Sequence, residues 1–232
     1  MESSGVMMEL DHVVYFSKQP PEIHVQKHEG TATGGRHKNW GTVNALTYTR
    51  DSYIEYLSVE HMEVTKQANH PLTKLLLHDL EFGEGWGTIC FRTDNMVALD
   101  ERLKSEGWKT SGVLNAERET SSGFVRKWKM LFIEQEVSNE LPLPFFIEWE
   151  ESFEERMNSL RKDGTLQDIN ERMQISQCVF AVKDPIDCVK EWSRLLNIDS
   201  EGHMIPLPNT NIVFQHTDVL QERLSIVKVT KD

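Results

Sequence analysis

Residues 10–16 (LDHVVYF), 86–92 (WGTICFR) and 176–182 (SQCVFAV) are three short segments rich in β-branched and aromatic residues. Polar or glycine-containing sequence bounds each of them, which is typical of a β-strand. A helical pattern follows the second and third segments, with a capping Asp or Asn and then apolar residues three or four apart. Three further runs typical of β-strands complete each unit. The chain therefore reads as three βαβββ units, of which the first has only a short helix.

These units predict an α+β fold. A β-rich unit of this size leaves an unpaired sheet edge, and two such units remove that edge by pairing. We expect residues 8–60 and 84–150 to form one curved mixed sheet around a concave pocket. Residues 151–173 predict a helical linker, and residues 174–232 predict a third, appended unit. That unit either covers an edge of the first two or meets its counterpart in a homodimer.

Composition and charge exclude several classes of function. The 232 residues include 25 Lys and Arg against 37 Asp and Glu, a formal net charge of -12, so the chain lacks the positive charge with which proteins bind nucleic acid. No apolar run approaches the roughly 18 residues of a membrane helix, and residues 1–5 lack the pattern of a signal peptide. We therefore expect a cytoplasmic protein that makes no membrane contact. Three well-separated cysteines predict reduced core residues.

Polar residues within apolar strands are the first candidates for chemistry. His12 lies in the opening strand of the first unit and Glu55 in its closing strand. The Ile-Glu-aromatic sequence around Glu55 recurs around Glu148, and Thr88 takes the place of His12 in the second unit. If the two units are related by an approximate twofold axis, one imidazole, two carboxylates and a hydroxyl converge. Such a set suits a catalytic divalent metal; the alternative is that each is an ordinary, satisfied strand residue.

A second group of residues is suited to holding a substrate. In residues 34–37 (GGRH), the glycines allow a close backbone approach, Arg36 can grip a carboxylate or phosphate, and His37 titrates near neutrality. The alternative is a tight turn with solvated side chains. Residues 83–87 are glycine-rich but precede a strand, so we expect no nucleotide cofactor. The remaining candidates for substrate contact are Asn44, Trp128 and Trp149.

These motifs together resemble the vicinal oxygen chelate superfamily, and more narrowly its glyoxalase-like domain proteins. The resemblance covers about residues 10–150 and rests on residues 10–16 (LDHVVYF), 34–37 (GGRH), 40–46 (WGTVNAL), 53–55 (YIE) and 145–149 (FFIEW). It implies a divalent ion (Zn, Ni, Mn, Mg or Fe) bound by His12, Glu55 and Glu148. It also implies lyase or isomerase chemistry on a small, oxygen-rich molecule. Glu148 is then the first candidate for the catalytic base, Glu55 competes with it, and His37 is a further catalytic candidate.

Two other functions remain open at this point. Thr88 departs from the His or Gln usual in the family, which favours a metal-free protein that sequesters a small molecule, as the bleomycin-resistance members do. A third possibility is a non-catalytic scaffold in which Glu55 and Glu148 are paired with Arg or Lys. Substitution of His12 separates an enzyme from both of these, because only the enzyme would lose metal and activity.

Overall fold

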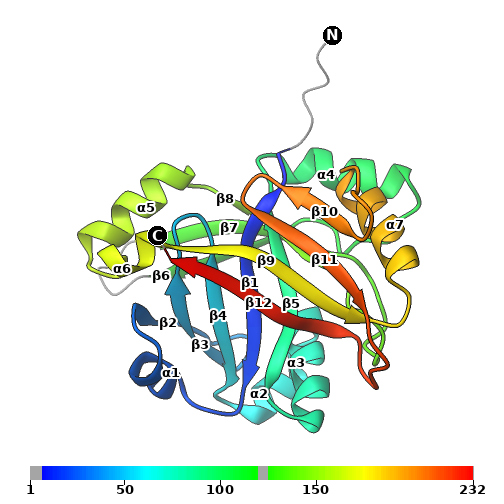
Figure 1. The fold of residues 1–232 in the computed structure, drawn as a ribbon. Coiled ribbons are helices and arrows are strands. Elements are labelled where there is room, and N and C mark those ends of the chain that lie inside the picture. Colours follow the sequence, from blue (N-terminus) through cyan, green and yellow to red (C-terminus); the bar gives the residue numbers. More distant parts are fainter. Residues whose placement is uncertain (1–6, 120–124, 232) are drawn as a thin grey trace.

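The computed structural model describes residues 7–119 and 125–231, and Figure 1 shows two β-sheets with helices around them. Phe124, which we expected to open a strand, lies outside the described residues. Residues 1–5, which we considered for a signal peptide, also lie outside them. The strands are β1 (Glu9–Ser17), β2 (Thr31–His37), β3 (Thr42–Tyr48), β4 (Tyr53–Val59), β5 (Gly85–Arg92), β6 (Leu114–Glu119), β7 (Val125–Phe132), β8 (Phe145–Trp149), β9 (Met173–Val182), β10 (Met204–Leu207), β11 (Thr210–His216) and β12 (Arg223–Lys231). The helices are α1 (Pro21–Lys27), α2 (Met62–Gln67), α3 (Pro71–Phe82), α4 (Met96–Ser105), α5 (Phe153–Lys162), α6 (Asp168–Glu171) and α7 (Pro185–Leu196).

The larger sheet has eight strands in the order β2-β3-β4-β1-β5-β8-β7-β6. Within each of the first two units the opening strand is parallel to the closing strand, β1 to β4 and β5 to β8. The antiparallel pairing of β1 with β5 joins the two units into one sheet. The expected α+β fold, with paired βαβββ units in a curved mixed sheet, is confirmed.

The third unit forms a separate four-stranded sheet in the order β10-β11-β9-β12. Here the parallel partner of β9 is the third strand of the unit, β11, while β12 pairs antiparallel on the other side of β9. The strand that corresponds to β4 of the first unit is therefore β11, and Phe214, which pairs with Phe180, takes the place of Glu55. Val227 lies on β12 instead, so the sequence pattern alone does not align it with Glu55.

Helices α4 and α7 begin at the caps that their sequences predict. The side chain of Asn95 accepts a hydrogen bond from the backbone of Ala98 at 3.0 Å and starts α4. Asp184 caps α7, and Pro185 fills the first helical position, where no backbone N–H is needed. These caps fix where each helix begins on the sheet.

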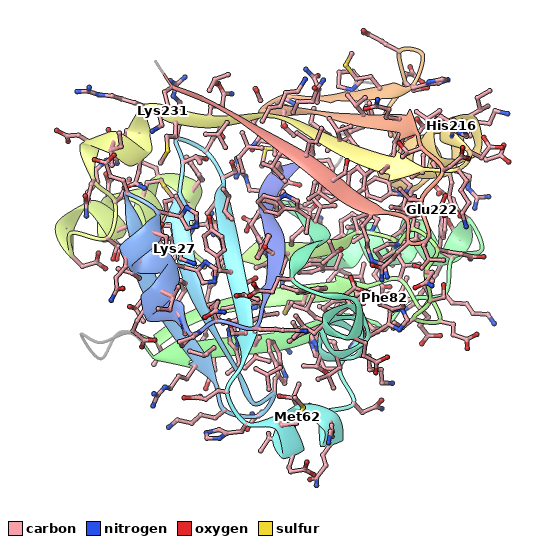
Figure 2. The ribbon with its side chains drawn as sticks, turned by 60° about the horizontal axis from the view of Figure 1, so that its bottom comes forward. Lys27, Met62, Phe82, His216, Glu222 and Lys231 are labelled. Atoms are coloured by element: carbon pink, nitrogen blue, oxygen red, sulfur yellow. The ribbon has the colours of Figure 1, made fainter. Side chains whose placement is uncertain are left out.

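The two faces of the large sheet are covered differently. Figures 1 and 2 both show the second sheet lying over the large one. Phe180 and Phe214 of the second sheet, together with Trp192 of α7, share one apolar core with α4 and with Val13 and Phe91 of the large sheet. On the opposite, concave face, α3 packs its leucines against β1 and β5. Helix α3 thus fills one half of the concavity and leaves the other half open.

None of the helices in the described residues is both long and apolar enough to span a bilayer. Cys90 and Cys178 are buried, Cys188 is half-buried, and all three are free thiols, as predicted.

Candidate functional site

The open half of the concave face holds a groove of about 1540 Å³ between β2, β3, β6, β7 and β8. A smaller pocket of about 70 Å³ lies deeper, and His37, Arg126, Trp128 and Trp149 line both of them. His12 and Glu55 line only the deep pocket. Of the residues expected to contact substrate, Asn44 lines the deep pocket and both tryptophans form walls, with ring centroids 5.5 Å apart.

A bulge in β1 places two successive side chains at this site. The pairing of β1 with β5 shifts between Leu10 and His12, so the normal alternation of side chains is interrupted at Asp11. Bulges re-aim side chains in this way. As a result Asp11 reaches the ring of its own neighbour, with Oδ1 2.8 Å from Nδ1 of His12.

Asp11 is fully buried and held as an anion. Its Oδ2 accepts from the indole N–H of Trp149 at 2.9 Å and from Arg156 at 3.4 Å. Burial alone would raise the pKa of Asp11, but Arg156, the hydrogen bond with His12 and the nearby positive charges outweigh burial and lower the pKa well below its usual range. Arg156 also lies over the ring of Trp149, 4.2 Å from its centroid.

The other side of the His12 ring faces Glu55. Nε2 of His12 is 3.5 Å from Oε2 of Glu55, and the ring stacks on Tyr53 with centroids 4.5 Å apart. Oε1 of Glu55 accepts from the Asn44 side chain at 2.5 Å, and the Oδ1 atom of Asn44 accepts from the backbone N–H of Gly35 at 2.7 Å. The buried series therefore runs from Asp11 through His12 and Glu55 to Asn44.

The series fixes the orientation of the His12 ring. Because Asp11 is ionised, Nδ1 of His12 donates to it. Nε2 of His12 is then directed at Oε2 of Glu55. Asn44 donates to the far oxygen of Glu55 and holds that carboxylate in its orientation. An imidazole and a carboxylate held together next to a cavity are side chains of the kind that act as acid and base.

Glu148 lines the outer groove but is not brought to the deep pocket with His12 and Glu55. On β8 the side chains of Phe145, Ile147 and Trp149 line the deep pocket, and strand alternation turns Glu148 away from it. Its Oε2 accepts from the backbone N–H of Met96 at 2.5 Å, at the start of α4, and its Oε1 accepts from Lys129 at 2.8 Å. Glu55 pairs with Val14, whereas Glu148 lies two residues after Phe146, the partner of Phe91. Val14 and Phe91 belong to the cores on opposite faces of the sheet, so the two glutamates of the repeated Ile-Glu-aromatic sequence face opposite sides.

A three-ligand metal centre is therefore not assembled. Asp11 and Glu55 contact opposite nitrogens of one ring, so with His12 they cannot share an ion. Cys90 pairs with His12 across β1 and β5, and burial raises the pKa of its thiol well above the usual range. Thr88 is buried and lines a different groove, beside α3. Within the residues that the structure describes, no three His, Cys, Asp or Glu side chains are placed to hold a metal.

The glycine-rich segment, residues 34–37, lines the outer groove. A Cβ atom on Gly34 would lie 1.9 Å from Oδ1 of Asn44, so glycine is needed there to leave room for the Asn44 side chain. The Arg36 side chain is 71% exposed and pairs with Glu60 at 2.9 Å. Nδ1 of His37 is 3.0 Å from the hydroxyl of Thr42 at the edge of the groove.

Three residues of the site have no distinctive signal in the sequence. Asp11 is hidden by strand alternation, because a bulge cannot be read from the pattern. Arg126 lies in a strand with other basic residues, and Arg156 belongs to the segment expected to be a linker. The capping box at Ser152 predicts α5, but nothing in its pattern indicates that the arginine is buried.

The fold and cavity define a class, that of paired βαβββ proteins with a cavity on the concave face. A model of the glyoxalase-like domain matches residues 10–196. The chain therefore belongs to the glyoxalase-like domain family. No functionally curated protein matches its sequence significantly.

Solved structures share the fold to different extents. A hypothetical protein from Staphylococcus aureus is 26% identical with a TM-score of 0.79, covering 96% of this chain and 91% of its own. Methylmalonyl-CoA epimerase from Mycobacterium tuberculosis is 15% identical with a TM-score of 0.41, covering 68% and 97%. A Streptomyces coelicolor epimerase variant, in complex with 2-nitronate-propionyl-CoA, is 17% identical with a TM-score of 0.41, covering 63% and 100%.

Proposed function

We propose that the protein catalyses proton transfer on a small organic molecule bound in the concave cavity, as an isomerase or lyase, with His12 and Glu55 as the acid–base pair. The supporting observation is the buried series from Asp11 to Asn44, with contacts of 2.8, 3.5 and 2.5 Å. A pocket that only binds an apolar molecule does not require a buried carboxylate that orients an imidazole. Titratable groups held in this way beside a cavity are typical of catalytic sites.

The reaction follows from the orientation of these side chains. Asp11 orients His12 and stabilises its protonated form, while Asn44 orients Glu55. One member of the pair removes a proton from a carbon next to a carbonyl group, and the pair then returns it to a neighbouring atom or to a leaving group. Tyr53, stacked on His12 at 4.5 Å, limits rotation of the imidazole. We derive no step through a metal, because the donors do not assemble around one ion.

Hydrogen exchange in D₂O tests this proposal directly. The probes are 2-oxobutanoate and dihydroxyacetone phosphate, with their uncharged counterparts methyl 2-oxobutanoate and dihydroxyacetone, and exchange of protons next to the carbonyl is followed by NMR on chelator-treated protein. We expect exchange above background for at least one probe. His12→Gln and Glu55→Gln should each lower that rate by about a hundredfold or more. Unchanged exchange in His12→Gln would overturn the assignment.

A metal-free binding function is the second candidate. The deep pocket is favourable for it, because most of its lining is aromatic or aliphatic, including Leu46, Tyr48, Trp128, Met130 and Phe145. Pockets of this composition bind small organic molecules through apolar contact with few polar groups. A probe that binds but undergoes no exchange, with the same affinity for His12→Gln, would support this function in place of catalysis.

A further inference from the structure

Arg126 is a buried cation on the wall of the cavity. It lies on β7 with 3% of its surface exposed, and it lines both the groove and the deep pocket. Trp128 follows two residues later and faces the same side of the strand. An arginine in this position adjoins any molecule that rests against Trp128 and Trp149.

The hydrogen bonds of Arg126 are incomplete. Its Nε is 2.8 Å from Oε2 of Glu151, but the N–H does not point at that oxygen, and both atoms are without a hydrogen bond among the described residues. Nη2 donates to Ser159 at 3.3 Å, and the described part of the chain supplies no acceptor for Nη1. A guanidinium has five donors. Buried polar groups are nearly always satisfied, so this exception calls for a partner.

The other cations near the cavity differ from Arg126 in their partners or their exposure. Arg156 contacts Asp11 and lies over Trp149, and Lys129 pairs with Glu148 at 2.8 Å. Arg36 pairs with Glu60 and is largely exposed, so water screens its charge. Two lysines, Lys38 and Lys127, line the groove but are exposed and do not line the deep pocket. Arg126 is itself ion-paired with Glu151, but it combines burial and a position on the deep pocket with an Nη1 group that has no acceptor among the described residues.

We propose that Arg126 binds the anionic end of the substrate, and that the substrate is a small organic anion bearing a carboxylate or phosphate together with a carbonyl group. Two parallel N–H bonds from a guanidinium match either anion, while the remainder of the molecule lies between Trp128, Trp149 and the His12–Glu55 pair. This inference rests on the proposed function. It transfers to Arg126 the anion-binding role that the sequence indicated for Arg36.

The test compares each charged probe with its uncharged counterpart. Affinities of 2-oxobutanoate, methyl 2-oxobutanoate, dihydroxyacetone phosphate and dihydroxyacetone are measured by tryptophan fluorescence and ligand-observed NMR. We expect wild-type protein to prefer at least one charged member, and Arg126→Gln to weaken that probe about tenfold or more with little change for the uncharged one. Comparing the carboxylate probe and its ester with the phosphate probe and its uncharged counterpart shows which anion the site binds. The control Arg161→Gln removes a similar Arg–Glu pair, outside the lining of both cavities, and should leave all four affinities unchanged.

Two outcomes would overturn the inference: no charged probe binding more tightly than its counterpart, or a preference that survives in Arg126→Gln. Circular dichroism checks that Arg126→Gln is folded, and Arg126→Lys, which keeps the charge but loses the paired bonds, gives a second variant. His12→Gln separates the two proposals. If it retains the preference for the anion and its exchange rate equals that of wild type, the catalytic assignment fails while the anion site stands.

Discussion

At the scale of single residues, His70 predicts a pH-dependent stability. Its ring is 8% exposed, lies 4.2 Å from the Trp40 ring and packs edge-on against Phe132, and both ring nitrogens lack a hydrogen-bond partner among the described residues. Burial, followed by the charge of His37, lowers its pKa from 6.5 to about 4. The unfolded chain therefore binds a proton between these two values that the folded chain does not, and stability falls as pH falls through that window.

Replacing His70 with Phe removes this titrating group and preserves a ring against Trp40. By the linkage relation, wild-type protein should lose about 2 kcal/mol of unfolding free energy between pH 8 and pH 5 through this residue. His70→Phe should lose correspondingly less. Urea unfolding of both proteins at the two pH values measures the difference. An equal loss in both would show that His70 titrates normally in the folded protein.

The chemistry of the candidate site was predictable residue by residue only in part. His12 and Glu55 stand out because they are polar residues in apolar strands, and the structure brings them together. Asp11 was not predicted, because the normal alternation of side chains would place it on the other face of the strand from His12. The bulge in β1 turns it to the same face. Arg126 and Arg156 resemble the other basic residues of the chain, and burial, which distinguishes them, is a property of the fold.

At the scale of elements, the start of α4 tests the observed position of Glu148. Its carboxylate binds the backbone of Met96 and pairs with Lys129, so it stabilises a helix N-terminus. Glu148→Gln should lower the unfolding free energy by about 1 kcal/mol while leaving exchange and binding unchanged. Glu150→Gln, an exposed neighbour, is the control. Loss of hydrogen exchange in a stably folded Glu148→Gln protein would contradict this prediction and would assign Glu148 a catalytic role.

The elements themselves were largely predictable, whereas their register was not. Caps and apolar spacing gave α4 and α7, and β-branched runs gave the opening strands of all three units. The relation between units depends on which residues pair across strands. Val14, the partner of Glu55, and Phe91, the partner of Phe146, lie on opposite faces of the sheet, so Glu148, two residues after Phe146, faces away from the side of Glu55. Local propensity does not carry that information, because an offset of one residue leaves the composition of a strand unchanged.

At the scale of the whole molecule, the third unit is fastened to the first two by buried polar contacts as well as by the shared core. Arg223 of β12 forms two bonds of 2.8 Å to Asp79 of α3 and donates to the backbone of Ser138 and Glu140. The side chain of Asn209 both donates to and accepts from the backbone of Leu10 at 2.9 Å. Two sheets joined in this way should unfold together.

Arg223→Met tests that coupling, because it leaves the Asp79 carboxylate buried without its cation. Removing one partner of a buried ion pair costs about 3–5 kcal/mol, while replacing both with apolar residues costs much less. Asp79→Leu combined with Arg223→Met should therefore be more stable than Arg223→Met alone. In urea unfolding followed by tryptophan fluorescence and by circular dichroism, we expect one coincident transition for all three proteins, since Trp192 packs at 6.2 Å against Phe91 of the large sheet. Two separate transitions, with the site still binding its probe after the first, would instead make the third unit an independent domain.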